Sequence, residues 1–95
     1  MSLFSKPIKI RVVLYDDIFE PYGEHGKSVM FLYKEALGKR LRETFLFAEI
    51  EITSSPDHRQ AGHVVEGTES DHLNDHYQSL VEAIDSDLWQ QLLEL

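Results

Sequence analysis

The segment from Lys9 to Thr53 constrains the fold of this chain most strongly, because two different hydrophobic periods follow one another in it. Residues 9–15 have an apolar residue at every second position, which is the period of a half-buried β-strand. Residues 46–53 show the same period, and residues 26–44 between them have the spacing of a long amphipathic helix. Such a unit is most simply a right-handed crossover joining two parallel strands.

The remainder of the chain adds a doubtful strand and a strong helix. Val64 and Val65 could form a short third strand, and residues 70–95 are helical in pattern, with Ser70 as a plausible N-cap. We therefore expect a two-layer α/β or α+β fold. Its sheet of two or three strands is packed by a central helix and by a C-terminal helix or helix pair. At 95 residues, the chain is expected to form a single domain, residues 1–95.

Charge is distributed unevenly along the chain, whose formal net charge is −8. Residues 1–44 hold eight of the nine basic residues and six acidic ones, a balance of +2, whereas residues 45–95 hold one basic and eleven acidic residues, a balance of −10. Such asymmetry can steer a basic partner toward one face, although a charged surface also simply keeps a small protein in solution. Nonspecific binding to nucleic acid is not expected, because that requires basic residues to neutralise phosphates.

Composition narrows the cellular setting. The chain has no cysteine, which excludes disulfides and thiolate metal sites. It has no apolar run of membrane-spanning length, and residues 1–7 lack the apolar core of a secretory signal. We expect a cytoplasmic protein that does not enter membranes.

The acidic segment 16–26 follows the first strand and is expected to be a loop. In open α/β sheets, ligands usually bind where a strand ends, so Asp16, Asp17, Tyr22 and His25 are candidate ligands for a hard metal ion or a small molecule. The competing interpretation is that the carboxylates only complement the N-terminus of the following helix, and that the aromatic residues pin the loop to the core.

Two residues interrupt the pattern of the central helix. Phe31 falls among the lysines of the polar face and is a candidate anchor for a partner, since aromatic residues are enriched at interfaces. Arg40 falls on the apolar face, where it can pair with a carboxylate from the acidic half. On the sheet, Lys9 and Arg11 share a face with Glu49 and Glu51 if the strands pair, which permits cross-strand ion pairs.

The C-terminal helix has an acidic face formed by Asp71, Asp75 and Glu82, which then gives way to Trp89 and Leu93. Two interpretations remain open. The helix breaks near residues 85–87 and a second helix follows, or it continues and buries Trp89 and Leu93 against another chain. The second interpretation implies a homodimer through this helix.

His72 and His76 are four residues apart, which is the spacing at which two imidazoles on one helix can bind a metal ion. His58 and His63 precede them and could supply a third ligand. The pattern is weak, because two exposed histidines on a polar helix face are usually only solvated.

No catalytic motif is present, and no cofactor is expected. The pattern favours a small acidic, non-catalytic interaction protein, such as an inhibitor, an immunity-type protein or an adaptor, that docks on a basic protein surface. The alternative is a small metal-binding domain or metal-dependent enzyme that uses His72 and His76, or Asp16 and Asp17. Whether the chain is an enzyme stays open, with the balance toward a binding role.

Overall fold

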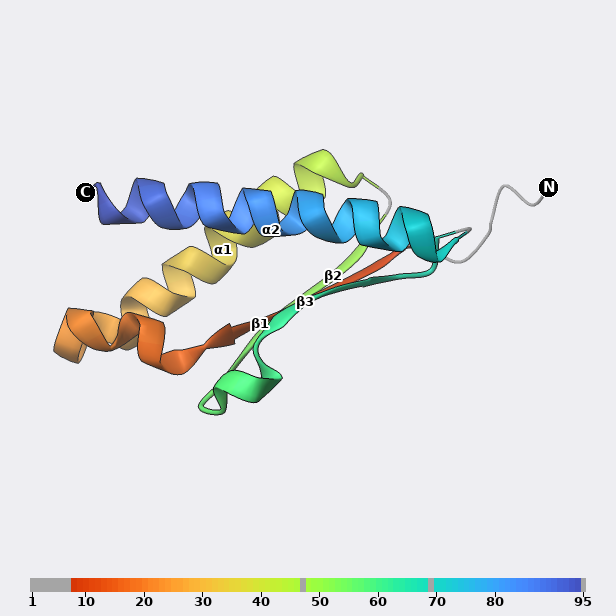
Figure 1. Ribbon diagram of the computed structural model, residues 1–95. Helices are drawn as coiled ribbons and strands as arrows, with labels where there is room; N and C mark the ends of the chain where they lie inside the picture. The colour runs from red at the N-terminus through yellow and green to blue at the C-terminus, as the bar shows by residue number, and fades with distance from the viewer. Residues whose placement is uncertain (1–7, 47, 69, 95) are drawn as a thin grey trace.

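The computed structural model describes residues 8–46, 48–68 and 70–94 (Figure 1). Its elements follow one another in the order β1 (Lys9–Tyr15), η1 (Asp16–His25), α1 (Gly26–Thr44), β2 (Glu49–Ser55), η2 (His58–Gln60), β3 (Gly62–Glu66) and α2 (Asp71–Leu93). Of these, η1 and η2 are 3-10 helical segments. The strand–helix–strand unit expected from the two hydrophobic periods is confirmed.

The central strand of the sheet is β1, and the strand order is β2-β1-β3. β2 runs parallel to β1, with Lys9 opposite Glu49, and α1 forms the crossover between them. β3 runs antiparallel to β1, with Val65 opposite Ile10. The third strand that the sequence left open is therefore present, and the protein is a two-layer α+β fold.

The apolar row of β1 faces the two helices, which lie on the same side of the sheet (Figure 1). Ile10, Val12 and Leu14 are at most 4% exposed, and Leu37 of α1 and Val81 of α2 are fully buried against the same cluster. The period of two in the sequence thus places one face of β1 in the core, and each such buried side chain contributes about 1.5–3 kcal/mol.

The opposite face of the sheet carries the charged row. Lys9 Nζ lies 4.0 Å from Glu49 Oε2, and Arg11 Nε lies 3.5 Å from Glu51 Oε2. These cross-strand ion pairs match the expectation from the sequence. All four side chains are more than 60% exposed, so each pair contributes less than about 1 kcal/mol.

Residues 16–25, expected as a loop, instead form the 3-10 segment η1. Its kink is at Gly23, where φ is 56°, in the left-handed region that favours glycine. Phe19 is only 2% exposed and packs edge-on against Tyr33 of α1, with ring centroids 5.9 Å apart. A buried aromatic residue thus pins the segment, which adds a wall to the core at the end of β1.

The helix α2 is continuous from Asp71 to Leu93, so of the two interpretations for residues 85–87 the unbroken helix is the one observed. Ser70 is the predicted N-cap, and its Oγ accepts the backbone N–H of Leu73 at 3.2 Å. The Asp87 carboxylate pairs with Arg40 Nη1 at 2.7 Å. Because this carboxylate has a side-chain partner on α1, it does not compete with the backbone hydrogen bonds of the helix.

Candidate functional site

A hollow of about 270 Å³ lies among residues of η1, α1, β3 and α2. It is lined by Ile18, Tyr33, His63, Glu82, Asp85, Ser86 and Trp89. These residues come from four elements that are separated in the sequence, so only the folded chain assembles them. The hollow combines aromatic walls with a few ionisable groups, which is the usual composition of a site that orients a bound group.

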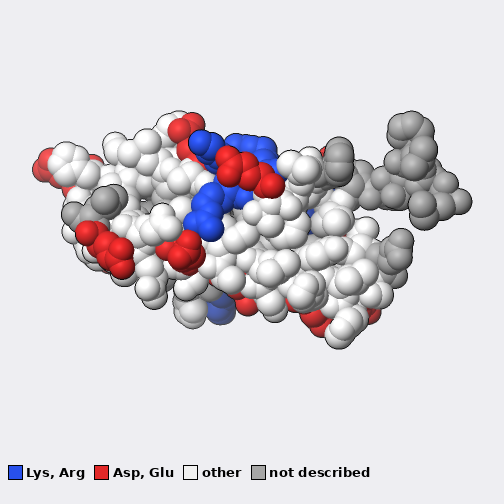
Figure 2. Space-filling model, turned by 90° about the horizontal axis from the view of Figure 1, so that it is seen from above, with Lys and Arg blue, Asp and Glu red and all other residues white. Residues whose placement is uncertain are grey.

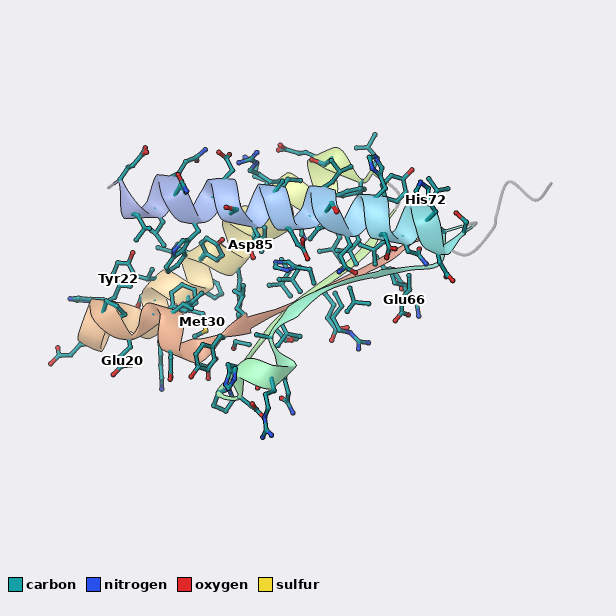
Figure 3. The ribbon with its side chains drawn as sticks, in the orientation of Figure 1. Glu20, Tyr22, Met30, Glu66, His72 and Asp85 are labelled. Atoms are coloured by element: carbon teal, nitrogen blue, oxygen red, sulfur yellow. The ribbon has the colours of Figure 1, made fainter. Side chains whose placement is uncertain are left out.

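Asp85 is the centre of a polar network in this hollow, and it lies on the side of α2 that faces α1 and the sheet (Figure 3). His63 Nε2 lies 2.6 Å from Asp85 Oδ2, and the Tyr33 hydroxyl donates a hydrogen bond to the same carboxylate. The Tyr33 hydroxyl also lies 2.8 Å from the backbone carbonyl oxygen of Asp85. One carboxylate therefore ties α1, β3 and α2 together.

Burial strengthens this network. Tyr33 is 5% exposed, and the side chains of His63 and Asp85 are 21% and 18% exposed. Burial, the hydrogen bond to Asp85 and the negative charge of that carboxylate together raise the pKa of Tyr33 well above its ordinary value. Tyr33 therefore keeps its proton at neutral pH and acts as a donor, which helps to offset the cost of burying the Asp85 carboxylate.

Trp89 forms an aromatic wall of the hollow. Its ring packs edge-on against Phe19 and Tyr33, with centroids 5.7 Å away in both cases. Because Phe19 and Tyr33 are themselves buried, these contacts hold the indole in one orientation. Trp89 thus presents a fixed surface to anything that enters the hollow.

Among its described lining residues, the hollow contains an oriented histidine without a hydrogen-bonded nucleophile. His63 is oriented by Asp85, as the base is in a catalytic triad. Ser86 lines the same hollow, but its hydroxyl forms no hydrogen bond to His63. A nucleophile must lie within hydrogen-bonding reach of its base to be activated. What the hollow does offer is an exposed carboxylate, Glu82, and an indole, Trp89, on the same lining.

The predicted acidic face of α2 is present as a row of exposed side chains, Asp71, Asp75 and Glu82. Within the part of the chain that the structure describes, their carboxylates form no ion pair or hydrogen bond. The row leads to the hollow, because Glu82 belongs to both. Figure 2 shows that the face carrying α2 is largely uncharged, with acidic groups scattered over it and basic groups gathered near its middle.

The three apolar candidates for interaction lie in different surroundings. Phe31 is 60% exposed and lines a groove beside β2. Leu93 is 63% exposed at the end of α2. Trp89, expected next to Leu93 on an outer surface, is instead turned into the chain against Phe19 and Tyr33. The structure therefore does not bring these three residues together.

The candidate ligands of residues 16–25 are also dispersed. The Asp17 carboxylate accepts the Tyr15 hydroxyl at 2.7 Å, and this hydrogen bond raises the pKa of Tyr15. Asp16 has one buried carboxylate oxygen without a hydrogen-bond partner among the described residues. Tyr22 packs against the core cluster, and His25 is exposed.

The histidine pair of α2 lies on the surface. His72 is on the outer side of the helix near its start (Figure 3), and His76 is also exposed. Across residues 8–46, 48–68 and 70–94, no three His, Asp or Glu side chains gather in a way that could hold a metal ion. Neither of the two predicted pairs, His72 with His76 or Asp16 with Asp17, has a third ligand there.

Sequence reasoning missed the network of Tyr33, His63 and Asp85. The sequence pattern presents His63 only as a possible metal ligand and residues 85–87 only as a possible break in the helix, and it gives Tyr33 no polar role. One signal could have indicated the network. Asp85 follows Ile84 and Val81 on the apolar side of the predicted helix, and a carboxylate there needs a buried donor.

Comparison of the chain with protein-family models, with curated proteins and with solved structures found no match to any of them. Within the described residues, neither helix is long and apolar enough to span a membrane. The interpretation of function therefore depends on the geometry and charge of the molecule itself.

Proposed function

We propose that this protein is a non-catalytic interaction protein of the cytoplasm that binds a basic surface of another protein through α2 and the adjoining hollow. The observation that carries the proposal is the position of Glu82. This carboxylate ends the acidic row of α2 and also lines the hollow beside Trp89. A long cationic side chain can therefore lie against the indole and extend its charged head toward the carboxylate, which is about two helical turns away on α2.

An arginine or lysine side chain has the shape and charge that this hollow suits. Its aliphatic stem can lie against Ile18 and Trp89, and its charged head can reach Glu82. A cation over an aromatic ring gains about 0.5–2 kcal/mol, and more when water is excluded. Arginine fits better than lysine, because its planar group both stacks on an indole and binds a carboxylate through two hydrogen bonds.

Asp71 and Asp75 supply the longer-range part of the interaction. Both are exposed and four residues apart, and they lie along the helix from Glu82. The net charge of −8 favours encounter with a basic partner over a nucleic acid or another acidic protein. Since acidic groups are scattered over this face (Figure 2), specificity depends on a well-placed cation in the hollow rather than on a continuous acidic patch.

Leu93 alone gives little support to the homodimer that the sequence suggested for this helix. It is exposed, but Trp89 is engaged inside the chain. A single exposed leucine is ordinary on the surface of a monomer. We therefore assign the partner contact of α2 to the acidic row and the hollow.

Fluorescence of Trp89 tests the proposal, because it is the single tryptophan of the chain and lines the hollow. An arginine-rich peptide should change the emission in a saturable way, with an affinity that falls as salt is raised. The same peptide with citrulline in place of arginine keeps the shape and loses the charge, so it should not bind.

Two matched variants locate the contact. Glu82→Gln should weaken peptide binding about tenfold, which corresponds to about 1.4 kcal/mol. Glu94→Gln makes the same chemical change just past the C-terminal end of that helix and outside the hollow, and it should leave binding nearly unchanged. Equal binding of the citrulline peptide, or equal losses in both variants, would show that the proposed contact is wrong.

A further inference from the structure

The outer side of β2 is a sheet edge that no other described strand pairs with. β2 pairs with β1 over seven consecutive residues without a bulge, and it is an end strand of the sheet. Natural edge strands are usually blunted by proline, lysine, a bulge or a covering segment. The sequence of β2, EIEITSS, contains no proline or lysine, and its charged side chains Glu49 and Glu51 lie on the open face.

The backbone groups available at this edge can be identified. The Glu49 N–H donates to the Ile8 carbonyl oxygen at 2.8 Å, so Glu49 directs its backbone groups toward β1. Because these directions alternate along a strand, Ile50, Ile52 and Ser54 direct their N–H and C=O groups outward. The three N–H and three C=O groups of these residues therefore point away from β1 at the edge of the sheet.

A groove of about 350 Å³ runs beside this edge on the helical side of the sheet. It is lined by Phe31, Lys34, Glu35, Gly38, Arg42, Ile50 and Ile52. Phe31 is 60% exposed, and Ile50 and Ile52 are only half-buried, so α1 leaves the helical side of β2 incompletely covered. An occupant that satisfies both the edge and the groove must bring a strand and a helix together.

We propose that two copies of this chain pair antiparallel through β2, with the two-fold axis at Ile52, to form a continuous six-stranded sheet. A second copy supplies the strand for the edge and its own α1 for the groove, which a single extended peptide would not. Paired strands lie about 4.8 Å apart and packed helices about 8–10 Å apart, so both layers can close across one axis.

Charge selects this register among the neighbouring ones. With the axis at Ile52, Glu49 lies opposite Ser55 of the second copy and Glu51 lies opposite Thr53. With the axis at Ile50, Glu49 would lie opposite Glu51, and with the axis at Glu51 that residue would lie opposite its own copy. Like charges directly opposite each other destabilise a pair of strands. The Ile52 register is the longest that avoids them, since it pairs all seven residues of β2.

The helices are complementary about the same axis. A Cβ placed on Gly38 would lie 3.4 Å from Ile52 Cδ1, so Gly38 sits over the two-fold axis. Antiparallel helices crossing there place Arg42 of one copy opposite Lys34 of the other, with Glu35 beside it and Phe31 one turn away. Arg42 therefore has to turn from Lys34 toward Glu35 or Phe31 to gain a favourable contact. An ion pair and a cation–π contact are then available to each copy. The hollow near Trp89 lies between α2 and β3, away from this surface, so the proposal does not depend on the proposed function.

The mass of the full chain measured by light scattering as a function of concentration tests the proposal. The wild type should rise from 11.0 kDa to twice that mass. Phe31→Glu should remain a monomer at concentrations where the wild type is a dimer, and circular dichroism should show it folded, because Phe31 is largely exposed. Leu32→Glu is the matched control. Leu32 is 63% exposed but does not line the groove, so this variant should still form the dimer.

Thr53 tests the register, because it is exposed and lies opposite Glu51 of the second copy. Thr53→Glu should raise the dissociation constant about tenfold, and Thr53→Lys should lower it. A wild type that is monomeric at every concentration overturns the proposal. So does a dimer that is lost in Leu93→Glu but kept in Phe31→Glu, or one whose affinity responds in the same direction to both charges at position 53.

Discussion

Replacing Tyr33 with phenylalanine removes one hydroxyl from the core and leaves the ring in place. Tyr33 is 5% exposed and donates to the Asp85 carboxylate, so the substitution leaves that buried group with His63 as its remaining side-chain partner. A hydrogen bond to a charged group contributes about 1.5–3 kcal/mol. We therefore expect Tyr33→Phe to lower the free energy of unfolding at neutral pH by about 2 kcal/mol.

The raised pKa of Tyr33 makes this stabilisation depend on pH. In the unfolded chain the tyrosine ionises near its ordinary pKa of 10.0, whereas in the native protein burial, and then the hydrogen bond and charge of Asp85, keep it protonated above that pH. The stabilisation is complete below pH 10, where both states hold the proton. It is lost as pH rises further, because only the unfolded state releases the proton. The loss is about 1.4 kcal/mol per pH unit.

Urea unfolding followed by Trp89 fluorescence measures both the loss of stability at neutral pH and its dependence on pH. Trp89 reports on this part of the core because its ring centroid lies 5.7 Å from that of Tyr33. At neutral pH, about 2 kcal/mol should lower the midpoint of Tyr33→Phe by about 1 M urea. Above pH 10 the difference between the two proteins should shrink and close roughly 1.5 pH units higher. The difference isolates Tyr33, because all other titrating groups are common to both proteins. Equal stability at neutral pH, or a difference that stays constant above pH 10, would refute the reasoning.

Two further substitutions test the packing and the capping of the helices by the same unfolding assay. Leu37→Ala should cost about 2–5 kcal/mol, because Leu37 is fully buried, whereas Leu32→Ala on the exposed side of α1 should change stability by less than about 0.5 kcal/mol. Ser70→Ala should lower the free energy of unfolding by about 1 kcal/mol, because it removes the side-chain acceptor for the Leu73 N–H. Backbone amides in the first turn of α2 should then exchange their hydrogens faster than in the wild type. Equal effects of the two leucine substitutions, or no change for Ser70→Ala, would contradict these assignments.

Hydrophobic periodicity was sufficient to predict those elements of the fold that depend on residues close together in the sequence. β1 and α1 follow from the two apolar periods, and Ser70 follows from the chemistry of helix capping. β3 was only a candidate, because five residues ending near a glycine carry little pattern. β3 pairs with β1, which is distant in the sequence, and Val65 is buried opposite Ile10. This long-range contact stabilises the strand, and it cannot be read from the local sequence pattern.

The candidate site could not be predicted in the same way, because its geometry depends on η1. On a helical wheel, Trp89 falls near the acidic row of α2, and it reads as an outer residue. In the folded chain, Phe19 of η1 extends the core to that side of the helix and packs edge-on against the partly buried indole. Asp85 lies on the buried side of the same helix, where the fold brings Tyr33 from α1 and His63 from β3 to its carboxylate.

The contrast between a basic first half and an acidic second half serves the fold as well as any partner. Among the residues that the structure describes, three ion pairs join the two halves: Lys9 with Glu49, Arg11 with Glu51, and Arg40 with Asp87. Each pairs a base from residues 1–44 with an acid from residues 45–95, so part of the −10 charge is met within the chain.

What remains of that charge is concentrated on α2. The carboxylates of Asp71, Asp75 and Glu82 have no such partner in the described chain, and Glu82 adjoins the hollow. Substituting a base that pairs internally, such as Arg11, would expose another carboxylate without creating a comparable binding point, because the described residues that line the pocket there include no aromatic side chain. The charge distribution therefore predicts an acidic surface in general, whereas the placement of Glu82 and Trp89 on one hollow predicts where a cation would bind.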